Sequence, residues 1–120
     1  MSVAAFWKSR AETPPAHPNE LDLRRIERAL RNRERYRYVT PRVVASDDGY
    51  LVRSPCCSRT VDPEGGEIDV AWLRWCDGAR GWELLGKDHG AGRWIADSAF
   101  ARLPDLLAWL NHDPDRKFWQ

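Results

Sequence analysis

The sequence predicts an α+β domain with an N-terminal helix, an antiparallel meander of four or five strands and a C-terminal helix. Three observations support this fold class. Apolar residues recur at helical spacing near both ends, segments of strand character separated by glycine-containing turns fill the middle, and five of the seven tryptophans lie between Trp72 and Trp109. So much indole surface has to leave water, which predicts one core shared by helices and strands.

The first helix is expected over residues 20–35. Asn19 is a favourable N-cap, and Glu20 and Asp22 place negative charge at the positive end of the helix dipole. Apolar residues at i, i+3 and i+7 fall on the side expected to face the core, namely Leu23, Ile26 and Leu30. Residues 1–18 contain three prolines and are expected to form a flexible arm, leaving residues 19–120 as one domain.

Five segments of strand character follow, over residues 43–46, 50–54, 68–75, 82–86 and 93–96. Asp48-Gly49 favours a tight hairpin between the first two, because such turns need positive φ angles. The segment 68–75 is apolar on both faces, with Val70 and Trp72 on one and Leu73 and Trp75 on the other. This pattern predicts a central strand that is covered on both sides or kinked by a bulge.

The second helix is expected over residues 103–111. Pro104 suits its first turn, and four leucines fall on one side of it, namely Leu103, Leu106, Leu107 and Leu110. Asp113-Pro114 is expected to end the helix, because the residue before a proline disfavours helical conformation. Phe118 and Trp119 would then either fold back onto the domain or stay exposed.

The composition indicates a soluble, globular chain. The 120 residues are 42% hydrophobic and 31% charged, with a net charge of +1, and a chain of this length normally forms one domain. No apolar run approaches the roughly 20 residues of a membrane span, and the N-terminus lacks the features of a signal peptide. The three cysteines, an odd number, favour reduced thiols and therefore a cytoplasmic location.

Three segments carry a resemblance to a known family, namely residues 69–75, residues 81–85 and Gly92-Arg93-Trp94. They resemble the strand-turn-strand core of the bacterial family called domain of unknown function 3024, over about residues 20–97. The resemblance implies a bacterial, cytoplasmic α+β domain of unassigned activity, and it supplies no catalytic residues. Residues 54–58 depart from the family's pattern, so the resemblance does not extend to a shared surface or partner there.

Four side chains form the candidate redox or metal set, namely Cys56, Cys57, Cys76 and His89. Their types suit tetrahedral zinc, but adjacent cysteines in an extended chain project to opposite faces, whereas zinc sites use pairs separated by a few residues. A disulfide between Cys56 and Cys57 is disfavoured, because their Cα atoms would lie about 3.8 Å apart. The simplest interpretation is one buried thiol and one loop thiol without a cofactor. A redox-active Cys57 and a zinc site are the alternatives.

No catalytic arrangement can be assembled from the sequence. Lys87-Asp88-His89 places an acid beside a potential base, but carboxylates in turns are usually only solvated. Gly90-Ala91-Gly92 precedes a strand and not a helix, so it provides no helix N-terminus for a phosphate. We therefore expect that the chain is not an enzyme.

The arginines of the first helix are the best binding candidates. They recur at i, i+4, i+7 and i+11 and form a stripe away from the apolar side, consisting of Arg24, Arg28, Arg31 and Arg35. Such a stripe suits a phosphate backbone or an acidic protein, although Glu20 and Glu27 stand four residues before Arg24 and Arg31, as in ordinary solvated helices. We expect a non-enzymatic interaction module with an unidentified protein partner; nucleic-acid binding through the stripe is the alternative.

Overall fold

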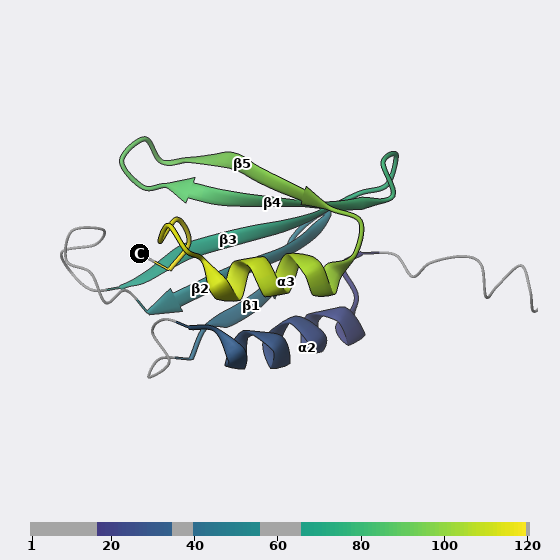
Figure 1. The fold of residues 1–120 in the computed structure, drawn as a ribbon, viewed down its shortest axis with the longest axis horizontal. Coiled ribbons are helices and arrows are strands. Elements are labelled where there is room, and N and C mark those ends of the chain that lie inside the picture. The colour runs from purple at the N-terminus through teal and green to yellow at the C-terminus, as the bar shows by residue number, and fades with distance from the viewer. Residues whose placement is uncertain (1–16, 35–39, 56–65, 120) are drawn as a thin grey trace, which may run out of the picture.

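The computed structural model describes residues 17–34, 40–55 and 66–119 (Figure 1). Its helical elements are α2 (Glu20–Ala29), the short 3-10 helix η1 (Leu30–Asn32) and α3 (Leu103–His112). Its strands are β1 (Arg42–Ala45), β2 (Gly49–Pro55), β3 (Glu67–Cys76), β4 (Gly81–Asp88) and β5 (Arg93–Phe100). They form one sheet in the order β1-β2-β3-β4-β5, with every neighbouring pair antiparallel. The predicted α+β meander between two helices is confirmed.

One core lies between the sheet and the helices. In Figure 1, α2 runs alongside β1 and α3 lies in front of the sheet. The largest fully buried apolar side chains of this core come from both helices, η1, the strands and the C-terminal segment, namely Ile26, Leu30, Tyr50, Val52, Leu73, Leu84, Leu106, Leu110, Phe118 and Trp119. Of the two outcomes predicted for Phe118 and Trp119, the structure shows the first: both fold back and are buried.

A β-bulge explains why β3 is apolar on both faces. Val52 of β2 lies opposite Ala71, but its neighbour Arg53 lies opposite Asp69, which leaves Val70 without a partner in β2. Val70 and Ala71 are consecutive and both are buried in the core, as a bulge permits. Of the two predicted explanations the bulge is correct, since neither described helix covers the other face of the sheet (Figure 1).

The prediction that the tryptophans between Trp72 and Trp109 share one interior is wrong for two of them. Trp82 is buried in the core, and Trp75 and Trp109 pack against the core while partly exposed. Trp72 and Trp94 lie on the opposite face of the sheet, with their ring centroids 5.8 Å apart. Strand alternation is the reason: Ala71 and Leu73 face the core, so Trp72 between them points away from it.

The first helix ends earlier than the predicted residue 35. Arg33 adopts an extended conformation with φ −67° and ψ 150° directly after η1. Its side chain is buried, with Nη1 donating to the carbonyl oxygen of Leu30 at 2.8 Å and the guanidinium carbon 5.3 Å from the Trp119 ring centroid. Packing of this cation on an indole near the C-terminus favours the turn out of the helix.

The last strand is longer than predicted. Its expected end is residue 96, but β5 continues to Phe100.

Candidate functional site

β5 is the last strand of the sheet, and β4 is its only neighbour. Within the part of the chain that the structure describes, the backbone of β5 makes no hydrogen bond outside its ladder with β4. In an antiparallel edge strand the remaining N–H and C=O groups point outward as an unpaired row. Along the eight residues of β5, this row is a template to which another extended chain can hydrogen bond.

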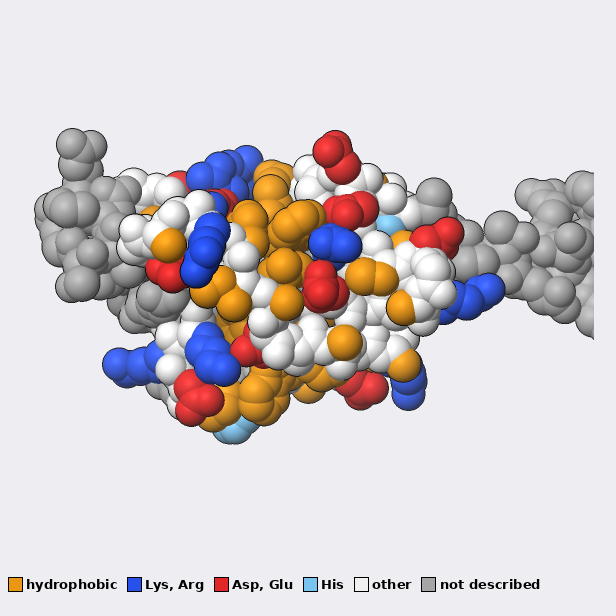
Figure 2. Space-filling model, turned by 90° about the horizontal axis from the view of Figure 1, so that it is seen from above, with side chains coloured by type: hydrophobic (Ala, Val, Ile, Leu, Met, Phe, Trp, Pro, Cys, Tyr) orange, Lys and Arg blue, Asp and Glu red, His pale blue; other side chains and the backbone are white. Residues whose placement is uncertain are grey.

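A groove of ≈ 420 Å³ lies next to β5 on the side of the sheet that faces the helices. Its apolar lining consists of Ile95, which is 48% exposed, Ala96, and the buried ring of Phe118 from the C-terminal segment. Gly86 of β4 lets the Phe118 ring pack close to the sheet, since a Cβ at this position would lie only 3.2 Å from that ring. Figure 2 shows a band of hydrophobic side chains across the molecule, seen from above Figure 1. The groove can therefore receive an apolar side chain from a strand added to β5.

The C-terminal segment that supplies Phe118 is held in place by Asp113. This residue ends α3 in the left-handed conformation, with φ 36°, and is 1% exposed. Its Oδ1 accepts a hydrogen bond from the backbone N–H of Lys117 at 2.8 Å, and its Oδ2 accepts from those of Phe118 at 3.2 Å and Trp119 at 2.8 Å. One carboxylate thus satisfies three consecutive N–H groups and fixes the turn that forms the groove.

Asp97 is one of two carboxylates that line the groove, with Asp88, and it is already engaged. It receives hydrogen bonds from the Ser98 hydroxyl at 2.9 Å, the Trp109 indole N–H at 3.2 Å and the Lys117 ammonium at 3.1 Å. Burial alone would raise the pKa of Asp97, but these three donors together lower the pKa below its ordinary value. The carboxylate therefore stays ionised and neutralised by Lys117, and the middle of β5 presents little net charge.

On the opposite face of the sheet, cations lie over the two indoles. The Lys87 ammonium is 4.9 Å from the Trp94 ring centroid, and the Arg74 guanidinium carbon is 5.7 Å from that of Trp72. Lys87 also pairs with Asp69 at 3.5 Å, and Arg74 pairs with Glu83 at 3.4 Å. A strand added to β5 would alternate its side chains between the groove on one face and Trp94 on the other.

The structure separates the members of the arginine stripe. Arg24 is engaged by both Glu20 at 3.0 Å and Glu27 at 3.1 Å. Arg28 and Arg31 are exposed and form no ion pair with any described residue. Arg35 lies outside the described residues. The two arginines available for binding a partner are therefore Arg28 and Arg31.

Cys76 and His89 of the candidate metal set do not come together. Cys76 lies opposite Gly81 at the start of β4, whereas His89 follows Asp88 at the end of that strand. Eight strand residues separate these ends by about 25 Å. Cys56 and Cys57 lie outside the described residues, among which no cluster of three potential metal ligands occurs. A single ion therefore cannot bind both Cys76 and His89.

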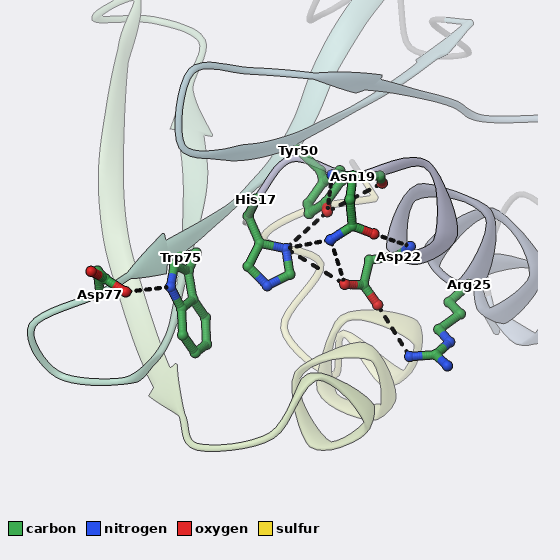
Figure 3. Close-up of polar contacts among 7 residues, drawn as sticks. All are labelled: His17, Asn19, Asp22, Arg25, Tyr50, Trp75 and Asp77. Carbon is green, nitrogen blue, oxygen red and sulfur yellow. Dashed lines mark hydrogen bonds and ion pairs between the residues drawn. The ribbon is translucent and has the colours of Figure 1, made fainter. Parts of the chain in front are cut away.

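A buried polar network, which the sequence did not reveal, ties the start of α2 to the sheet (Figure 3). His17 Nδ1 lies 3.0 Å from the Tyr50 hydroxyl of β2 and 3.6 Å from an Asp22 carboxylate oxygen. The ring centroids of His17 and Trp82 are 4.7 Å apart. Asn19 caps α2 by accepting from the Asp22 N–H at 2.8 Å, as predicted. The docked part of the chain therefore begins by residue 17, before the expected boundary at residue 19.

Burial sets the electrostatics of this network. The side chain of His17 is only 7% exposed, and burial lowers its pKa even though Asp22 lies close enough to raise it. Burial likewise raises the pKa of Tyr50. The network therefore favours a neutral imidazole and a neutral phenol, both engaged within the fold, and it acts as a structural clamp.

Fold and site together define a small α+β domain whose sheet ends in the open edge of β5. The sequence profile of the family described as "Domain of unknown function (DUF3024)" matches residues 14–120. The chain belongs to this family, as the resemblance over about residues 20–97 predicted. No match was found among curated proteins or among solved structures. None of the described helices has the length and apolar character needed to cross a membrane.

Proposed function

We propose that this domain is a protein-interaction module that binds an extended segment of a partner protein along β5. The observation that carries the proposal is the unpaired backbone row of β5 beside a groove that exposes Ile95. Backbone hydrogen bonds to the row would supply affinity, and alternate side chains would supply specificity. Ile95 would contact one side chain of the added strand, and Trp94 the next.

A peptide display library tests the proposal. Random peptides are selected on the whole chain, synthesised and titrated by calorimetry. Ile95→Asp should weaken the selected peptides at least about tenfold, because a desolvated carboxylate opposes binding in the groove. Leu21→Asp is the matched control: Leu21, on α2, is the other large exposed hydrophobic residue described, at 59% exposure, and its substitution should leave binding unchanged.

Methylation of the peptide backbone provides the second arm of this test. In an added strand, alternate peptide N–H groups bond to β5 and the others point away. Single N-methyl groups should therefore abolish binding at every second position and be tolerated between them. A library without binders, equal weakening by Ile95→Asp and Leu21→Asp, or no alternation along the peptide would each contradict strand addition.

Nucleic-acid binding through the first helix is the second candidate. Arg28 and Arg31 favour it, because they are exposed and have no carboxylate partner among the described residues. Two phosphate contacts would give a weak, strongly salt-dependent complex. A mobility shift at low salt that Arg28→Gln/Arg31→Gln removes would support this candidate, and the absence of any shift would contradict it.

A further inference from the structure

We infer that the segment bound by β5 is apolar in its middle and acidic at both ends. This inference rests on the proposed function, since it requires that β5 accepts a strand. It goes further by assigning the chemical class of the partner. The basis for this assignment is the distribution of charged side chains along the β5 edge.

Each end of the β5 edge carries an exposed arginine that forms no ion pair with a described residue, although Asp88 of β4 lies opposite the first of them. Arg93, the first residue of β5, is exposed and forms no ion pair with a described residue. At the other end, Arg102 follows β5 by two residues and is also exposed without an ion pair. Arg80 is a third exposed arginine near this end, because its neighbour Gly81 lies close to the chain that follows β5: a Cβ at Gly81 would be 3.8 Å from the Cα of Ala101. Carboxylates at the two ends of an added strand would meet these cations.

Between its ends, the edge is apolar or neutralised. Ile95, Ala96 and Ala99 are exposed along β5, and none of them carries charge. The charge of Asp97 is paired with Lys117 at 3.1 Å. An added strand therefore meets small or apolar side chains in the middle, where a charged residue would lose hydration without a partner.

The same charges disfavour a second copy of the chain as the occupant. Two β5 strands pairing antiparallel about a two-fold axis would bring Arg93 of each copy to the Arg102 end of the other. At both ends of the shared ladder, Arg93 of one copy would thus lie close to Arg102 of the other, and the two positive charges would repel each other. Charged residues at a sheet edge are a common way to prevent self-pairing. An acidic segment removes this repulsion.

Two synthetic peptides test the inference by fluorescence polarisation. Both have alternating valine and threonine in the middle; one carries two glutamates at each end and the other two lysines. The glutamate peptide should bind the whole chain about tenfold tighter at low salt, since exposed ion pairs contribute little individually. The preference should shrink as salt screens the charges.

Paired charge reversals locate the effect. Arg93→Glu/Arg102→Glu should abolish the preference for the glutamate peptide. Arg28→Glu/Arg31→Glu changes the net charge equally on α2, so the preference should persist. Arg93→Glu alone makes the edge self-complementary, and sedimentation should show a dimer that the wild-type chain does not form.

Several results would overturn the inference. They are equal binding of the two peptides, persistence of the preference in the β5 reversal, a wild-type dimer broken by Ile95→Asp, or oligothymidine competing as well as the glutamate peptide. Display-selected peptides that bind with the alternating N-methyl pattern but without acidic ends would refute only the inference about charge. Failure of that pattern would refute strand addition itself.

Discussion

The two edges of the sheet are built differently. β1 has four residues, and α2 lies against it, so that Ile26 and Leu30 bury next to Val43 in the core. β5 has eight residues and no helix along its outer edge, and it exposes Ile95 (Figure 1). The core-facing side of β1 is thus covered by α2, whereas no described helix runs along the outer edge of β5. The comparison teaches that the helix packed on one terminal strand contributes to stability, whereas the other terminal strand is the one for which we propose binding.

Truncation of Ile26 should have the largest effect. Its side chain is fully buried between α2 and the sheet. Ile26→Ala should lower the free energy of unfolding by about 2–5 kcal/mol through lost burial and the cavity left behind. Urea denaturation measures this loss. A change below about 1 kcal/mol would show that α2 contributes little to the fold, and the contrast between the edges would fail.

Removal of the Asp113 carboxylate should have a smaller effect. Asp113→Ala leaves three backbone N–H groups, two of them buried, without their acceptor, which should cost about 2–3 kcal/mol of unfolding free energy. Asp113→Asn keeps a carbonyl oxygen and should lose less. Because the turn positions Phe118, peptide binding at β5 should weaken in the alanine variant. Unchanged binding would separate the groove from the C-terminal turn.

Lowering the pH should weaken the buried network of His17, Tyr50 and Asp22 at the start of α2 and so reduce the free energy of unfolding. Burial holds the pKa of His17 below its ordinary value of 6.5, so the folded state opposes protonation. Stability from this group is therefore present above pH 6.5 and is lost as the pH falls from 6.5 towards the lower pKa of the folded state.

His17→Gln should flatten the decline of unfolding free energy measured between about pH 7 and pH 5. His89, whose pKa burial also lowers, provides the control. His89→Gln should leave the contribution of His17 in place. A slope that only His89→Gln removes would contradict the role of the clamp.

The smallest effect on stability is expected at Ile95. Ile95→Thr removes little buried surface and should change the free energy of unfolding by less than about 0.5 kcal/mol. The same substitution should still weaken selected peptides. Thermal melting and calorimetry on one sample would check both. A large loss of stability would mean that Ile95 belongs to the core, and the β5 edge would not be free.

Much of the fold could be predicted, because it depends on local patterns. Asn19 and the spacing of Leu23, Ile26 and Leu30 placed the first helix, and Pro104 with its leucines placed the last. The end of the first helix could not be predicted, since Arg33 packs on Trp119 from the far end of the chain. Local sequence carries no record of such a distant contact.

The candidate site was harder to predict. The expected sites were the arginine stripe and the cysteine set, which are conspicuous in the sequence. β5 carries no motif, and Asp97 disturbs its alternation through a shift of register between Leu84 and Leu85 of β4. One signal was available: the last strand of a meander is an edge. That Ile95 would remain exposed depends on how far α3 and the C-terminal segment reach across the sheet.

The sequence by itself determined the helices, the strands and their meander, because hydrophobic periodicity and turn residues act over a few neighbouring positions. Only the tertiary structure decided which indoles are buried in the core, which arginines of α2 form ion pairs, and that the β5 edge is exposed. These outcomes depend on packing between residues far apart in the chain. Such packing sets burial and pairing, and those in turn set what the surface can bind.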